Sequence, residues 1–154
     1  MTDRDFMEAS AGSRLALIAE SFARLTGRAL VPPGEDMWTM RRAVVAHGTE
    51  DVPLFFYGNA LALELFAITA ERFVGLPSHE SAEPAQRAER SAMLEGLERA
   101  NVVADYSGVR IAANGRRFWI DRAVVWNLLD QDEKRHGQAA TFTDWSPLPG
   151  GVFP

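Results

Sequence analysis

The sharpest cluster of reactive side chains in this 154-residue sequence is a histidine followed closely by two carboxylic acids. His47 precedes Glu50 and Asp51 in the segment HGTED. A histidine beside carboxylates could act as an acid or base, or could supply ligands to a metal ion. The same segment also suits a loop in which Thr and Asp side chains satisfy nearby backbone groups. We favour the loop, because spacing alone does not establish the geometry that a catalytic pair requires.

The other two histidines and the cysteine count give no stronger sign of catalysis or metal binding. His79 lies near Glu80 and Glu83 in a polar connection, but without the spacing of a metal motif such as HExxH. His136 lies in a charged turn, where we expect it to be solvated. The absence of cysteine excludes disulfides, thiolate ligands and flavin chemistry that adds a thiol. We therefore predict no metal site and no catalytic residue.

A set of aromatic and polar side chains could instead line a ligand pocket between a sheet and helices. Such side chains suit a small planar ligand, for example a flavin, a haem or an aromatic acid, and haem would also need an inward-pointing histidine. The alternative is that the aromatics fill the core and the asparagine caps a helix. The predicted ligand-binding residues are Tyr57, Asn59, Tyr106, Arg110, Trp119, Trp126 and His47.

Arginines on neighbouring predicted strands offer one further kind of site. Arg110 and Arg117 could clamp an anion if they share a face of the sheet. Like charges that face each other are more often spread over solvent or paired with carboxylates, here Asp105 and Asp121. We favour the paired arrangement.

Composition limits the partners that these residues could serve. The net charge of -5 argues against binding nucleic acid, which needs clustered Lys and Arg. No apolar run approaches the roughly 18 residues of a membrane-spanning helix, and residues 1–12 do not read as a signal peptide. We expect a cytoplasmic protein with one domain over residues 13–146, a flexible N-terminus (1–12) and a flexible tail (147–154).

The first half of the chain contains helices and a strand pair. Apolar residues at helical spacing predict an amphipathic helix between Ser13, as its cap, and Gly27, which would end it in a left-handed turn. A short helix is predicted over 35–42, and helices capped by Asn59 and Thr69 follow the strand pair. The last helix is predicted over about 85–100, after Pro84. The predicted strands are Ala43–His47 and Pro53–Tyr57.

The second half, from Asp105 to Trp145, reads as a three-stranded antiparallel meander. Asn114-Gly115 predicts a tight type I′ turn between its first two strands. In the second strand, Phe118, Ile120, Val124, Trp126 and Leu128 alternate with polar residues and should share one face. Other apolar residues interrupt this alternation, so both faces should be partly covered. The element order predicts an α+β fold, a five-stranded antiparallel sheet with helices over one face and the N-terminal amphipathic helix in addition.

Several segments resemble known families. PLFFYGNALALELF, with Asn59 before a helix, and the final strand ending DWS resemble a PAS domain. A closer resemblance is to the bacterial stand-alone MEKHLA-domain family, which is itself PAS-like. AHGTE, FFYGN, LPS, AEPAQRAER, DYSGVRI, GRRFWIDRAVVWNLLD and GQAATFTDW all look like blocks of that family, so the resemblance covers about 13–145.

The resemblance implies a sensory or small-molecule-binding module and carries no reaction with it. In plants a related domain lies at the end of homeodomain-leucine-zipper proteins, but this chain has no basic region or zipper, so DNA binding does not carry over. Output would pass through a partner protein or through self-association, for which the apolar stripe Leu15, Ile18, Phe22 and Leu25 offers a homodimer surface. That stripe could equally pack on its own sheet. The alternatives are a small α+β enzyme using His47 with Glu50 or Asp51, and a ligand-free protein-interaction domain.

Overall fold

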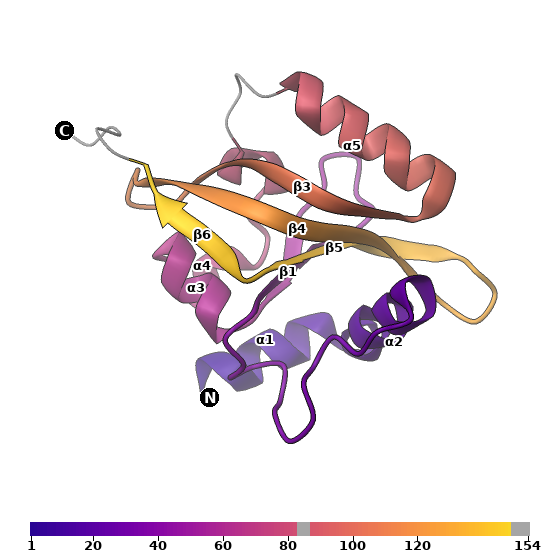
Figure 1. Ribbon diagram of the computed structural model, residues 1–154. Coiled ribbons are helices and arrows are strands. Elements are labelled where there is room, and N and C mark those ends of the chain that lie inside the picture. The colour runs from indigo at the N-terminus through magenta and orange to yellow at the C-terminus, as the bar shows by residue number, and fades with distance from the viewer. Residues whose placement is uncertain (83–86, 149–154) are drawn as a thin grey trace.

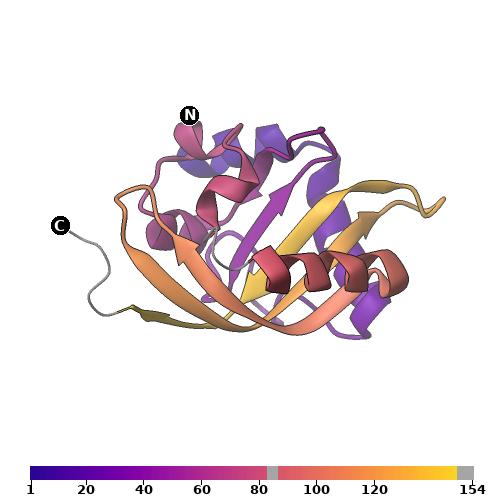
Figure 2. The ribbon, with the colours of Figure 1, turned by 90° about the horizontal axis from the view of Figure 1, so that it is seen from above.

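The computed structural model describes residues 1–82 and 87–148, which form an antiparallel sheet with helices on both faces (Figure 1). The N-terminal pair of helices lies on one side of the sheet and the long helix before the meander lies on the other (Figures 1 and 2). The strands are β1 (Ala43–His47), β2 (Phe55–Gly58), β3 (Val102–Ile111), β4 (Arg117–Leu129), β5 (Arg135–Phe142) and β6 (Asp144–Pro147). The helices are α1 (Asp3–Ala11), α2 (Arg14–Thr26), α3 (Ala60–Phe66), α4 (Ala70–Phe73), the 3₁₀ helix η1 (Ser78–Ser81) and α5 (Arg87–Ala100).

The strand order is β2-β1-β5-β4-β3, with β6 beside β4, and every pairing is antiparallel. β3 runs along one edge of β4. On the other edge, β5 pairs with 124–129 and β6 pairs with 118–121, so these two strands follow one another along the same side of β4. The α+β class, the hairpin of β1 with β2 and the C-terminal meander are therefore confirmed.

A bulge in β4 changes which residues face which side. Arg122 has a φ of 53°, and the pairing with β3 is irregular around it. An extra residue in one strand reverses the alternation of side chains beyond it. Phe118 and Ile120 consequently pack on the α5 side, whereas Trp126 and Leu128 pack beneath α1 and α2. The prediction that these four residues share one face was wrong for this reason.

The turn between β3 and β4 is also wider than predicted. Gly115 has a φ of 85°, but Asn114 does not adopt a positive φ, which a type I′ turn would require. The Ala112 amide donates to the Arg116 carbonyl and the Gly115 amide donates to the Ala112 carbonyl. This is the three-residue loop in which a type I turn is followed by a left-handed glycine.

The N-terminus is ordered, contrary to the prediction for residues 1–12. Thr2 and Asp5 form a capping box at the start of α1, in which each side chain accepts from the other residue's backbone amide. Met7 is completely buried, and the Ser10 hydroxyl donates to the Phe56 carbonyl at 2.8 Å. This helix was not predicted, because most of its residues are polar and only Met7 and Ala11 are buried among them.

α2 matches the predicted amphipathic helix, and its apolar stripe is used within the chain. Ile18 and Phe22 are buried, and the Phe22 ring meets the Trp126 ring edge-on with centroids 4.9 Å apart. Gly27 ends the helix with a φ of 73°, as predicted. Ser13 makes no capping hydrogen bond, because its backbone is already helical at the junction with α1.

Between α2 and β1 the chain turns without forming the helix predicted over 35–42. The Asp36 carboxylate accepts from the Thr39 amide at 2.9 Å and the Asp36 carbonyl accepts from the Met40 amide at 3.1 Å, which closes a single turn that does not continue as a helix. Further on, Asn59 and Thr69 cap α3 and α4 as predicted. Of the tail predicted for 147–154, Pro147 belongs to β6 and residues 149–154 lie outside the described part of the chain.

Candidate functional site

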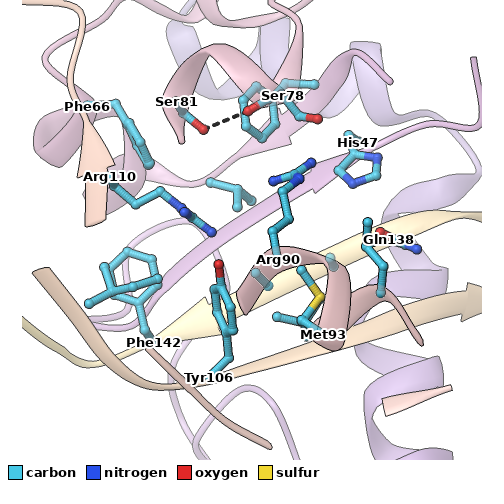
Figure 3. Close-up of a pocket in the computed structure, with 17 residues that line it drawn as sticks. His47, Phe66, Ser78, Ser81, Arg90, Met93, Tyr106, Arg110, Gln138 and Phe142 are labelled. Atoms are coloured by element: carbon cyan, nitrogen blue, oxygen red, sulfur yellow. Dashed lines mark hydrogen bonds between the residues drawn. The ribbon is translucent and has the colours of Figure 1, made fainter. Parts of the chain in front are cut away.

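A pocket lies between α5, η1 and the face of the sheet opposite α1 and α2 (Figure 3). Its free volume is about 60 Å³, which is room for roughly four to six water molecules. All five strands of the main sheet path contribute to it, so its walls come from segments far apart in the sequence. The polar side chains that line the pocket include His47, Ser78, Arg90, Tyr106, Arg110 and Gln138.

Most of the pocket wall is apolar. Phe66 from α3 and Phe142 from β5 stand on one side (Figure 3). Ile120 and Val125 from β4 also line the pocket. Met93 from α5 is 8% exposed and contributes its thioether from above. This surface suits the apolar part of a ligand and leaves the polar groups to fix its orientation.

Two arginines bring positive charge into this apolar setting. Arg90 comes from the first turns of α5 and Arg110 from β3, and Figure 3 shows both side chains extending over the pocket. Burial lowers the pKa of Arg90, and the neighbouring charge of Arg110 lowers it further. The Arg110 guanidinium lies 5.6 Å from the centroid of the Tyr106 ring and donates to the Val109 carbonyl at 3.2 Å. The cations thus sit together beside a phenol group.

His47 reaches the pocket from the end of β1. Its Nδ1 lies 3.1 Å from the Gly48 carbonyl oxygen, which can only accept, so Nδ1 carries a hydrogen. Burial lowers the pKa of His47, and the charges of Arg90 and Arg135 lower it further. The hydrogen bond to Gly48 and the charge of Glu50 raise the pKa and partly offset this effect. The ring is therefore neutral at pH 7 and Nε2 is free of hydrogen.

The close approach of β5 fixes His47 in this place. Gly137 has a φ of 151°, and a Cβ on it would collide with the His47 carbonyl oxygen. Glycine therefore allows β5 to run directly beside β1, where His47 is the register partner of Gln138. Both side chains then reach the same pocket.

The rim formed by η1 carries a hydroxyl group without a partner. Ser78 is 5% exposed and lines the pocket, and among the described residues its Oγ has no hydrogen-bond partner. The Ser81 hydroxyl, by contrast, donates to the Ser78 carbonyl at 2.8 Å. A buried hydroxyl that lacks a partner is costly, so the Ser78 Oγ is a group that a ligand could satisfy.

Three of the seven predicted ligand-binding residues meet in this pocket: His47, Tyr106 and Arg110. The other four lie elsewhere. Trp126 faces α2, where its indole N–H donates to the Ile18 carbonyl at 3.2 Å, because the β4 bulge turns it away from the pocket. Trp119 lies before the bulge and is half-buried beside Ser146 of β6.

Tyr57 and Asn59 also serve the body of the fold. Tyr57 is 1% exposed within the core on the α1 side, and burial raises the pKa of its hydroxyl. The Asn59 amide oxygen accepts from the Val44 and Ala62 amides, while its nitrogen donates to the Met37 and Arg42 carbonyls. All hydrogen-bonding capacity of that side chain is therefore used within the protein.

The structure does not assemble the acid–base pair considered for the HGTED loop. The Glu50 carboxylate accepts from the Leu54 amide at 3.1 Å and lies over Gly48, and Asp51 is exposed. In the described part of the chain, the His47 ring forms one hydrogen bond, to the Gly48 carbonyl. The loop interpretation therefore fits the observed contacts. Among the described residues no group of three or more acidic or histidine side chains could hold a metal ion.

The predicted pairing of Arg110 with Asp105 or Asp121 is wrong. Asp121 accepts from the Ser107 hydroxyl, Arg122 forms a salt bridge with Asp144 at 2.7 Å, and no carboxylate among the described residues pairs with Arg110. Arg110 is the register partner of Phe118, which packs on the α5 side, so the Arg110 side chain lies on the pocket face of the sheet.

Sequence reasoning missed Arg90, Ser78 and Gln138. Arg90 was not among the predicted site residues, yet it stands three residues before the buried Met93 and seven before the buried Leu97. That spacing places all three on one side of α5 and was readable from the sequence. Ser78 and Gln138 carried no such signal, because their positions depend on the folding of η1 and on the β1–β5 register.

Comparisons with known proteins agree on family and fold. A family model described as the MEKHLA domain matches residues 13–147. The homeobox-leucine zipper protein HOX10 of rice, from Oryza sativa subsp. indica and subsp. japonica, is 26% identical over 111 residues. The match takes in 71% of this chain and 13% of HOX10, so this chain spans a small part of that relative's length.

Solved structures with a similar fold are PAS and light-oxygen-voltage domains. The PAS domain of a Colwellia psychrerythraea protein has a TM-score of 0.59 at 12% identity, covering 72% of this chain and 89% of that one. A light-oxygen-voltage domain studied with a flavin analogue has a TM-score of 0.54 at 13% identity, covering 71% of this chain and 78% of that one. The blue-light activated histidine kinase EL346 of Erythrobacter litoralis has a TM-score of 0.53 at 18% identity, covering 70% of this chain and 33% of that one. At these identities the likeness establishes the PAS fold alone.

No helix in the described part of the chain has the length and apolar character needed to cross a membrane.

Proposed function

This chain belongs to the MEKHLA domain family, and from that membership and the pocket we propose that it is a PAS-like sensory module that binds a small molecule beneath α5. The observation that carries the proposal is a polar set within an apolar pocket: two arginines, a neutral histidine and a serine hydroxyl that has no partner in the described part of the chain. Such convergence of few polar groups in an apolar pocket is typical of ligand sites.

A flavin does not fit this pocket, although a light-oxygen-voltage domain of the same fold was studied with a flavin analogue. The free volume of about 60 Å³ is far below the roughly 300 to 1,000 Å³ of pockets for larger ligands. The chain also has no cysteine to form a thiol adduct with a flavin. The ligand that we propose is therefore much smaller than the planar cofactors considered from the sequence.

A signal could cross the sheet through β4. Val125 lines the pocket, and the next residue, Trp126, packs under α2 on the opposite face. A ligand that shifts β4 would move Trp126 against Ile18 and Phe22. We propose that α2 then passes the change to a partner protein or to a second copy of the chain. The buried part of the predicted dimer stripe is already occupied, so the contact would use the outward side of α2.

Native mass spectrometry and an absorption spectrum of freshly purified protein test the proposal. We expect a retained small mass above the 17.0 kDa chain, or one acquired from a metabolite mixture. Ala140→Met should abolish this binding, because Ala140 lines the pocket. Ala104→Met is the matched control, since Ala104 is exposed on β3. A folded wild-type protein that neither retains nor acquires any small molecule would favour a ligand-free interaction domain.

A further inference from the structure

We propose that the pocket binds a short-chain monocarboxylate, with its carboxylate between Arg90 and Arg110 and its apolar end against Phe66, Phe142 and Met93. This inference rests on the proposed function and specifies the ligand class. It follows from the charge of the pocket, the position of its polar groups and its size.

The charge of the pocket is the first reason. Among the described residues no carboxylate forms a salt bridge with Arg90 or Arg110, although the chain pairs Arg4, Arg41 and Arg122 with acidic residues elsewhere. Both arginines are half-buried, and bringing two guanidinium groups together in a partly desolvated pocket is unfavourable unless an anion joins them. The lowered pKa of Arg90, caused by burial and by Arg110, reflects that cost. Guanidinium groups also match a carboxylate geometrically.

The polar groups are arranged to surround one small anion. Figure 3 shows the Arg110 guanidinium and the Tyr106 hydroxyl pointing toward each other, and Arg90 extending from α5 toward Ser78 and His47 on the other side of the pocket. The Ser78 hydroxyl, which lacks a partner among the described residues, is at the rim near Arg90 and can donate. Neutral His47, with Nε2 free of hydrogen, adds no positive charge. The cations and hydroxyls therefore supply the donors for the ligand.

Size and wall chemistry narrow the anion to a short carboxylate. A free volume of about 60 Å³ accepts roughly four to six non-hydrogen atoms. Acetate, propionate and butyrate fall in this range. Inorganic phosphate and nitrate also fit by size, but they have no apolar part to cover the phenylalanine and methionine side chains. Burying methylene groups against these side chains strengthens binding, so a carboxylate with a short apolar chain fits better than a purely polar anion.

Ligand-observed NMR titration of the full chain with acetate, propionate and butyrate tests the assignment. Sodium chloride keeps the ionic strength constant, and nitrate serves as an apolar-free anion of similar size. Propionamide is the matched neutral probe, because it keeps the shape of propionate without its charge. We expect saturable binding of propionate, at least about tenfold weaker binding of nitrate, and no saturation by propionamide.

Variants connect that binding to the pocket. Arg90→Gln and Arg110→Gln should each weaken propionate binding about tenfold or more, because each removes a charge-assisted contact. Ser78→Ala should weaken it about threefold. Arg116→Gln is the control, since Arg116 is an exposed arginine of the β3–β4 turn. Circular dichroism and thermal unfolding confirm that each variant is folded, and the comparison of propionate with propionamide needs no variant.

The possible outcomes separate this inference from the proposed function. Equal binding of propionate and propionamide, or of propionate and nitrate, would overturn the carboxylate assignment. Unchanged propionate binding in both Arg→Gln variants would overturn the site. Failure of all these probes, together with a different small molecule retained in native mass spectrometry and lost in Ala140→Met, would overturn this inference and leave the proposed function standing.

Discussion

At the scale of single residues, Asn59 joins three segments that are separate in the sequence. Its side chain binds the Val44 amide of β1, the first turn of α3 at Ala62, and the carbonyls of Met37 and Arg42 before β1. It is fully buried, so water cannot replace these hydrogen bonds. Asn59, which was predicted to bind a ligand, therefore has a structural role here.

Asn59→Ala should lower the free energy of unfolding by about 3 kcal/mol, because it removes a helix cap and leaves buried backbone groups without partners. Urea denaturation followed by circular dichroism measures this change. Asn114→Ala is the control, since that exposed turn residue makes one local hydrogen bond, and its effect should stay below about 1 kcal/mol. Similar losses in both variants would contradict the role assigned to Asn59.

His47 should make stability depend on pH. Burial lowers its folded pKa below the value near 6.5 of the unfolded chain. A group whose pKa is lower in the folded state stabilises the fold above the unfolded pKa, and this contribution is lost as the pH falls through the folded value. The free energy of unfolding should therefore decrease as the pH is lowered from 7.5 to 5.5.

Chemical denaturation at those two pH values checks the prediction. His47→Gln should show a smaller decrease than the wild-type protein, whereas His79→Gln, which changes an exposed histidine, should match the wild type. A decrease of the same size in His47→Gln would assign the pH dependence to other groups.

At the scale of elements, α1 was not predicted, and its anchoring depends on one long apolar side chain. Met7 is completely buried in the core shared by α1, α2 and β2. Met7→Ala should lower the free energy of unfolding by about 2 to 4 kcal/mol, through lost burial and a cavity. Met1→Ala is the matched control, because Met1 is 92% exposed. Equal unfolding midpoints for both variants would show that α1 contributes little to the fold.

The remaining elements show which signals in a sequence are reliable. The bounds of the strand Ala43–His47 were predicted correctly, because the strand contains two valines and a polar turn follows it. The helix caps at Asn59 and Thr69 were also correct, since they depend on local hydrogen bonds. The β4 bulge left only an interrupted alternation. Its position depends on pairing with β3, which no short-range pattern encodes.

The pocket shows the same limit. His47, Tyr106 and Arg110 were predicted because their types suit a ligand site, and they meet because β1 and β3 belong to one sheet, joined through β5 and β4. Trp119 and Trp126 have equally suitable types, but the bulge places Trp126 beneath α2 and α2 could not be assigned to a face of the sheet beforehand. Strand register therefore decides which side chains reach the pocket, and residue type alone does not predict it.

At the scale of the whole molecule, the two faces of the sheet are covered with unequal strength. α2 is bound to the end of β4 through Ser21, whose hydroxyl donates to the Leu129 carbonyl at 3.1 Å and accepts from the Leu129 amide at 2.8 Å. Ile18 and Phe22 are buried beside it. Among the described side chains of α5, Met93 and Leu97 are the buried apolar ones.

α5 is also held mainly at its C-terminal end. The Asn127 side chain donates to the Leu97 carbonyl at 3.2 Å and to the Asn101 side chain at 2.9 Å. The part of the helix that carries Arg90 over the pocket has no comparable hydrogen bond to the sheet among the described residues. This arrangement favours opening of the pocket by movement of α5 at that end.

Hydrogen exchange should therefore reveal a gradient along α5. The Met93 amide should exchange at least about tenfold faster than the Ile18 amide of α2, while the Asn101 amide should exchange more slowly than that of Met93, because local opening follows the number of packed and hydrogen-bonded groups. NMR-detected exchange at neutral pH measures these rates on one sample. Arg116→Gln provides a control variant whose rates at both helices should not change. Equal protection of α5 and α2 would mean that the pocket is closed by a rigid helix, and a ligand would then have to enter by another route.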